Sequence, residues 1–162
     1  MMNTTNQGCC PRCGWLGLGT DPMSLGLDRL EEVAAAALIE GRRAAGLLRA
    51  LPAEVNGQGG PASRHVLGVL AGQRLLDLAS HELVERLEHD LDLLVQRETY
   101  WVPTYGSAEA DEYVEPERRL TGLGLALAAA RDAAAEALAL SRRAHDLVVA
   151  ERAFAKERGL VM

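Results

Sequence analysis

Two long segments of the chain carry matching stripes of small apolar residues, and these stripes restrict the fold more than any other feature. In both segments the apolar residues recur at alternating steps of three and four, which is the spacing of one face of an α-helix. The stripes are Leu27, Leu30, Ala34, Ala37, Gly41, Ala44, Leu48 and Leu51, and Leu123, Ala126, Ala130, Ala133, Ala137, Leu140, Ala144 and Leu147. Because their centres are Ala and Gly, they predict helices that pack unusually close together.

Helix-ending signals set the expected bounds of the helices. Pro52 ends the first helix, a glycine-rich loop follows it, and Gly159 is a natural C-terminal cap for the last. We therefore predict an all-α fold, an elongated bundle of three long helices in up-down-up order. The expected helices span about residues 24–51, 64–98 and 117–158. The predicted domains are an irregular, Cys/Gly-rich N-terminal arm over residues 1–22 and a helical bundle over residues 23–162.

Composition and charge narrow the classes of partner. Hydrophobic residues make up 48% of the chain but aromatic residues only 4%, as expected for helix interfaces rich in Ala and Leu. The net charge of −6 disfavours nucleic-acid binding, which needs clustered Lys and Arg. Since no apolar run approaches the roughly 20 residues that span a bilayer, we expect no membrane insertion. Without a signal-peptide pattern at the N-terminus, the expected location is cytoplasmic.

The three cysteines, Cys9, Cys10 and Cys13, lie within five residues and are the sharpest chemical signal in the sequence. The run Cys10-Pro11-Arg12-Cys13-Gly14 resembles one knuckle of a zinc ribbon, in which two thiolates bind the metal. A complete ribbon needs a second cysteine pair, so a zinc site here would need Cys9, a histidine or the same knuckle from another chain. The competing interpretation is a set of free thiols.

A second candidate metal site lies in the middle helix. His81, Glu85 and His89 are spaced four residues apart and therefore share one helix face. Nitrogen and oxygen ligands in this order suit zinc, iron or manganese. The face is expected to point away from the leucine stripe of the same helix, which favours the simpler interpretation of a solvated surface.

Four of the six aromatic residues lie in the expected connection over residues 99–116. Tyr and Trp on a loop offer rigid, amphipathic contact area of the kind that interface hot spots use. The candidate protein-binding residues are Tyr100, Trp101, Tyr105 and Tyr113. The alternative is that these rings only cover the end of the bundle.

The lengths of the helices predict self-association. A last helix of about 40 residues is some 60 Å long, whereas the first is about 40 Å, so apolar residues at the far end would lack a partner within one chain. These are Leu147, Val148, Val149 and Phe154. A helix seam centred on Ala126, Ala130, Ala133 and Ala137 would pack against the first helix or a symmetry mate, and we expect a homodimer.

The sequence contains no complete catalytic set, so we do not expect an enzyme. The first hypothesis is a non-catalytic helical interaction protein, a self-associating accessory or regulatory subunit that binds another protein. A metal-dependent helical-bundle enzyme using the His and Glu residues of the middle helix is the second hypothesis. A small zinc-binding regulator of nucleic acid, using the cysteine arm, is the third.

Overall fold

The computed structural model describes residues 22–103 and 115–159 of the chain. These residues are mostly helical, which confirms the all-α class. The helices are α1 (Pro22–Arg49), α2 (Arg64–Ala71), α3 (Leu78–Arg97) and α4 (Gly122–Glu157), with a short 3-10 helix η1 (Gln73–Leu76) before α3. Two short strands, β1 (Thr99–Val102) and β2 (Glu117–Leu120), join α3 to α4 as an antiparallel hairpin.

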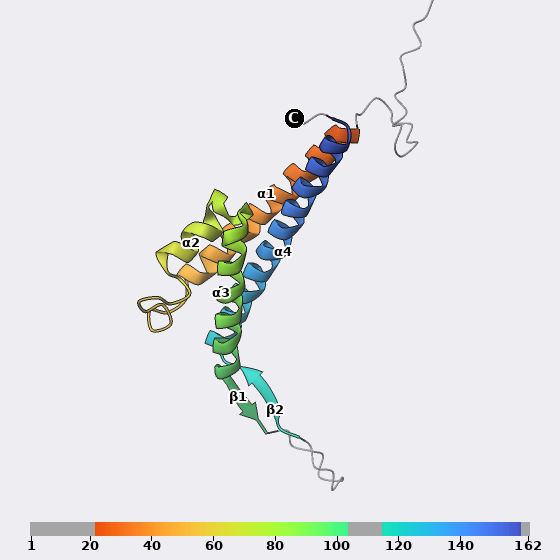
Figure 1. Ribbon diagram of the computed structural model, residues 1–162. Helices are drawn as coiled ribbons and strands as arrows, with labels where there is room; N and C mark the ends of the chain where they lie inside the picture. Colours follow the sequence, from red (N-terminus) through yellow and green to blue (C-terminus); the bar gives the residue numbers. More distant parts are fainter. Residues whose placement is uncertain (1–21, 104–114, 160–162) are drawn as a thin grey trace, which may run out of the picture.

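Helix α4 runs the length of an elongated molecule, and the other helices pack along it (Figure 1). Helix α1 lies antiparallel to α4, so that Gly26 near the start of α1 meets Glu151 near the end of α4. Helix α3 is also antiparallel to α4, because Ser141 bonds to His81 whereas Arg131, earlier in α4, bonds to Asp92, later in α3. The first part of α4 therefore lies between α1 and α3.

The two small-residue stripes pack against each other within one chain. Ala37 and Ala44 of α1 are buried, as are Ala130, Ala133 and Ala137 of α4, whereas Gly41 faces Leu70 and Leu75. Alanine permits a close approach because it places little bulk between helix backbones. The stripes thus form much of the core, together with larger residues such as Leu48, Leu70, Leu91 and Leu127.

The expected order of three helices was wrong, since four helices lie in the described residues. The segment expected as one helix over 64–98 breaks at Gly72, which has an extended backbone, and again at Asp77. Helix α2 returns along α1, so that Leu70 comes to lie beside Gly41. This extra reversal makes α1 and α4 antiparallel, whereas an up-down-up order would make the first and last helices parallel.

The break also places Leu75 in the core. Its side chain is fully buried, and its backbone carbonyl accepts a hydrogen bond from α4 instead of continuing a helix. Close to it, a Cβ atom on Gly41 would lie 2.3 Å from the carbonyl oxygen of Leu70 and 2.9 Å from the side chain of Leu75. Only glycine at this position lets α1 pack so tightly on the bend.

The antiparallel order also changes the far end of α4. The expectation that this end lies uncovered was wrong, because the first half of α1 runs beside it (Figure 1). Leu147, Val148 and Phe154 are partly buried in this arrangement, and Val149 is exposed. The length mismatch between helices is therefore no argument for a dimer.

The glycine-rich loop after α1 is held in place by one side chain. The Asn56 amide donates to the carbonyl oxygens of Leu48 and Leu51 at 3.2 and 3.0 Å, and its oxygen accepts from the backbone N–H of Ala62 at 3.2 Å. These bonds satisfy carbonyl groups left free at the end of α1. Ser63 then caps the start of α2.

Strand β1 lies within the connection expected after α3. The expected start of the last helix at residue 117 was wrong, because Glu117–Leu120 pair with β1 as strand β2 and α4 begins only at Gly122. Thr99, Tyr100, Trp101 and Val102 all have high β-propensity, which explains why helix α3 ends where β1 begins. Thr121 joins the hairpin to α4, since its hydroxyl donates to Glu98 at 3.0 Å and accepts the N–H of Gly124 at 3.0 Å. The hairpin continues the long axis of the molecule beyond the helices (Figure 1).

Candidate functional site

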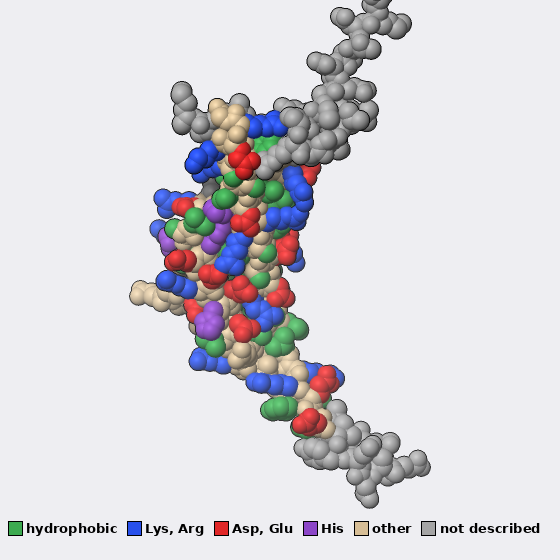
Figure 2. Space-filling model, turned by 45° about the vertical axis from the view of Figure 1, so that its right-hand side comes forward, with side chains coloured by type: hydrophobic (Ala, Val, Ile, Leu, Met, Phe, Trp, Pro, Cys, Tyr) green, Lys and Arg blue, Asp and Glu red, His purple; other side chains and the backbone are tan. Residues whose placement is uncertain are grey.

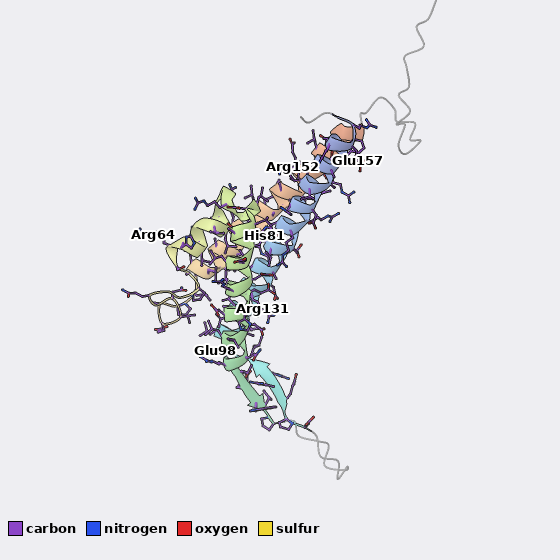
Figure 3. The ribbon with its side chains drawn as sticks, in the orientation of Figure 1. Arg64, His81, Glu98, Arg131, Arg152 and Glu157 are labelled. Atoms are coloured by element: carbon purple, nitrogen blue, oxygen red, sulfur yellow. The ribbon has the colours of Figure 1, made fainter. Side chains whose placement is uncertain are left out.

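Two places in the described residues are candidate sites because they combine polar side chains, sequence-predicted residues and access to solvent. The first is a shallow pocket of about 620 Å³ between the start of α3 and the middle of α4, lined in part by His81, Glu85, Arg142 and His145. The second is the aromatic hairpin at the other end of α3. Figure 3 shows His81 where α3 meets α4 and Glu98 beside the hairpin.

A buried chain of hydrogen bonds starts from His81, which lines the pocket. The Ser141 hydroxyl donates to the carbonyl oxygen of Leu75 at 2.5 Å, and the hydroxyl oxygen lies 2.7 Å from Nε2 of His81. A hydroxyl has one proton, and the carbonyl can only accept, so Nε2 of His81 must carry a proton and donate to Ser141. This fixes the tautomer of the imidazole and links η1, α3 and α4.

The pair of His81 and Ser141 does not have the arrangement of a nucleophile and its base. A base must accept the hydroxyl proton, whereas His81 donates to this oxygen. Ser141 is also fully buried, so no substrate atom can reach it. The arrangement instead gives the buried polar groups of His81, Ser141 and Leu75 their hydrogen-bond partners.

The environment of His81 favours its neutral form. Burial lowers the pKa of His81 below its ordinary value of 6.5, and the nearby Arg142 and His145 lower it further. The hydrogen bond to the Leu75 backbone and the carboxylate of Glu85 act in the opposite direction. The ring of His145 lies edge-on to that of His81, with centroids 6.4 Å apart.

The three residues predicted as a metal site on the middle helix have separate surroundings. His81 is buried, which corrects the expectation of a wholly solvated face, and Glu85 forms an ion pair with Arg142. His89 is exposed and lines another hollow with Asp92 and Arg131. Across residues 22–103 and 115–159, no three His, Cys, Asp or Glu side chains converge as metal ligands.

The hairpin exposes its aromatic residues on both faces. Adjacent residues of a strand point to opposite faces, and Trp101 and Tyr100 are 64% and 49% exposed. Neither face of the hairpin is therefore covered by the helices. Figure 2 shows hydrophobic side chains at this end beside acidic and basic ones, and acidic and basic side chains are also interspersed along the helical body on the face in view.

Arg118 holds the Trp101 side of the hairpin in a defined arrangement. It lies directly opposite Trp101 in the register, with its guanidinium carbon 5.8 Å from the centroid of the indole ring. The guanidinium also donates to the hydroxyl of Thr99 at 2.7 Å and to the carbonyl oxygen of Gln96 at 2.9 Å. A cation–π contact of this kind restrains the indole while most of it remains exposed.

The remaining predicted site residues divide into two groups. In the helix seam, Ala130, Ala133 and Ala137 are buried between α1 and α4, and Ala126 is exposed. Cys9, Cys10, Cys13, Tyr105 and Tyr113 lie outside the described residues, so the zinc site of the arm stays a prediction.

Sequence analysis missed Ser141 and Arg118. Ser141 lies between Leu140 and Arg142, where nothing in the sequence marks a partner 60 positions away in the chain. The sequence has only a weak indication that Arg118 lies in a hairpin. Two segments of equal length, Thr99-Tyr100-Trp101-Val102 and Glu117-Arg118-Arg119-Leu120, flank one connection.

The part of the chain that the structure describes has no helix long and apolar enough to cross a membrane. Comparison with protein-family models, curated proteins and solved structures gives no match.

Proposed function

We propose that this protein is a non-catalytic helical interaction protein, an accessory or regulatory subunit that self-associates and binds a second protein. The observation that carries this proposal is the exposure of Trp101 and Tyr100 on a hairpin that projects beyond the helices. Large aromatic side chains that are exposed on both faces of a strand pair usually mark a surface that a binding partner covers.

The hairpin chemistry is that of an interface. Trp, Tyr and Arg are the residues most enriched at binding hot spots, and this hairpin has Trp101 and Arg118 on one face and Tyr100 on the other. The contacts of Arg118 with Thr99 and Gln96 orient its side chain before any partner arrives. Such preorganisation reduces the entropy lost on binding.

The helical core does not need the hairpin aromatics. Its buried members come from α1, α2, η1, α3, α4 and the loop after α1, and neither strand contributes one. The exposed rings therefore add little to the stability of the fold, which supports a role in binding. His81 is hydrogen-bonded to Ser141, and Glu85 is ion-paired with Arg142. These two residues therefore give less support to the alternative of a metal-dependent enzyme.

Photo-crosslinking tests the proposal in cells that make the full-length protein. A photoreactive residue at Glu117, on the hairpin, should give adducts with a distinct protein that mass spectrometry identifies. The same residue at Glu82, exposed on α3, is the matched control and should not give them. Adding Trp101→Ala to the Glu117 probe should remove the adducts. Equal adducts from both positions, or none from either, would contradict a binding role for the hairpin.

A further inference from the structure

We infer that the open edge of β1 pairs with β1 of a second copy of this chain, antiparallel and centred on Tyr100, to form a four-stranded sheet. This inference rests on the proposed self-association and names the surface responsible. It follows from three features of the hairpin, namely the direction of its free backbone groups, the charges of its two edges and the position of Pro103.

The register shows which backbone groups are free. Thr99 lies opposite Leu120, and the N–H of Thr121 donates to the carbonyl oxygen of Glu98 at 2.9 Å, one step before this pair. In an antiparallel ladder, pairs that exchange hydrogen bonds alternate with pairs that do not. Tyr100 therefore bonds across to Arg119, and the N–H and C=O groups of Thr99 and Trp101 point away from β2, toward the open edge.

The two edges of the hairpin differ in charge. β2 contains Glu117, Arg118 and Arg119, and pairing two β2 edges about Arg118 or Arg119 would place like charges directly opposite one another. β1 contains no charged residue. Charged side chains are a common protection of edge strands against pairing, and only β2 has them. Self-pairing is therefore compatible with the β1 edge alone.

Pro103 selects the register on that edge. It follows β1 directly and has no N–H to donate, so a ladder that included this position would lose a hydrogen bond. Centring the pair on Tyr100 places Thr99 of each copy opposite Trp101 of the other. Each of these two pairs exchanges two hydrogen bonds, and every outward backbone group of Thr99 and Trp101 is satisfied. The two-fold arrangement is closed, so it stops at a dimer.

The paired sheet places favourable side chains together. On one face, the two Tyr100 rings meet at a pair that exchanges no hydrogen bonds, where side chains are closest, with Arg119 behind each ring. On the other face, Trp101 stays beside Arg118 and gains Thr99 of the second copy as a neighbour. A two-stranded hairpin is marginal alone, whereas four strands stabilise one another.

A cysteine scan tests this register. In full-length protein with Cys9, Cys10 and Cys13 replaced by Ser, Tyr100→Cys should form a disulfide-linked dimer on mild oxidation. The Cα separation of such a pair, about 4.5 Å, suits a disulfide. Thr99→Cys in the same background keeps the indole and should cross-link at least tenfold more slowly, because Thr99 lies opposite Trp101 of the other copy. Equal rates at the two positions would overturn the inference.

Because Tyr100→Cys removes the Tyr100 ring, two further variants test the pairing without cysteine. Trp101→Pro removes an outward N–H and should give a monomer in sedimentation, whereas Tyr100→Phe should remain a dimer. A dimer that survives Trp101→Pro would overturn the inference while leaving self-association intact. A wild-type monomer whose hairpin still cross-links to another protein would overturn it too, yet leave partner binding standing.

Discussion

Nε2 of His81 donates a hydrogen bond to the hydroxyl of Ser141, and this bond joins two helices at residues 60 positions apart in the chain. The hydroxyl of Ser141 in turn donates to the carbonyl of Leu75, so a single hydroxyl satisfies two buried groups. All three residues are buried, where the bend between α2 and α3 meets α4.

Replacing Ser141 by Ala should destabilise the fold. The substitution leaves Nε2–H of His81 and the carbonyl of Leu75 without this partner, and each unsatisfied buried group costs about 1–3 kcal/mol. Urea unfolding followed by circular dichroism measures the change. Thr99→Ala on the hairpin is the control, because it also removes a hydrogen-bonded hydroxyl but at an exposed contact, and it should change the free energy of unfolding far less. Equal effects would contradict the role of the buried chain.

The stability should fall as the pH is lowered through the range in which His81 titrates. Because the pKa of His81 is lowered in the folded state, the unfolded chain binds more protons below pH 6.5. The contribution of neutral His81 is fully present above that pH and decreases as the pH falls toward the folded pKa. Glu85 on α3, Arg142 and His145 on α4 and the Leu75 carbonyl of η1 are the groups that face this ring.

His81→Gln tests the origin of this pH dependence, since glutamine has an amide donor and does not titrate. The free energy of unfolding, measured at pH 7.5 and at pH 5.0, should differ less between these two pH values for the variant than for the wild type. An unchanged difference would assign the pH dependence to other groups.

Two glycines of α1 should respond in opposite directions to alanine. Gly41→Ala introduces a Cβ 2.3 Å from the Leu70 carbonyl oxygen, and such overpacking costs about 1–3 kcal/mol. Gly46 is exposed in the same helix with open space around it, so Gly46→Ala should stabilise the protein by about 0.5–1 kcal/mol. Thermal unfolding of both variants checks the signs, and a stabilised Gly41→Ala would contradict the tight packing of α1 on the bend.

The small-residue stripe of α4 provides another matched pair. Ala130 is fully buried, and enlarging it to Leu should destabilise the protein by roughly 1–3 kcal/mol. Ala126 lies one turn earlier in the same stripe but is exposed, so Ala126→Leu should be nearly neutral. Chemical denaturation distinguishes the two. A neutral Ala130→Leu would mean that the helices are not as close as the structure has them.

The stripes could be predicted because helical periodicity is a local property, and burial of Ala37, Ala44, Ala130 and Ala133 follows from it. The direction of packing could not, since it depends on a break at Gly72 that involves few residues and leaves the leucine pattern nearly continuous. A glycine within a helical pattern does not by itself determine whether the helix continues.

The same break explains the error at His81. The predicted stripe ran through Leu76, Leu83, Leu87, Leu91 and Leu94. Of these, Leu87 and Leu91 are buried, but Leu76 belongs to η1 and is exposed. The true buried face of α3 contains His81, Val84, Leu87 and Leu91. The hairpin was missed because strands of four residues are too short to show a clear alternation, and their pairing depends on residues across an intervening connection.

Sedimentation velocity over a range of concentrations tests the central claim, that the hairpin is the surface through which the protein associates. Three full-length proteins suffice, namely wild type, Trp101→Ala and Ile39→Ala. Ile39 on α1 is 62% exposed, nearly as much as Trp101, so it controls for the loss of exposed apolar surface. We expect the wild type and Ile39→Ala to form a dimer with the same affinity and Trp101→Ala to remain a monomer. A dimer that is lost in Ile39→Ala and retained in Trp101→Ala would contradict the account and place the interface on the helices.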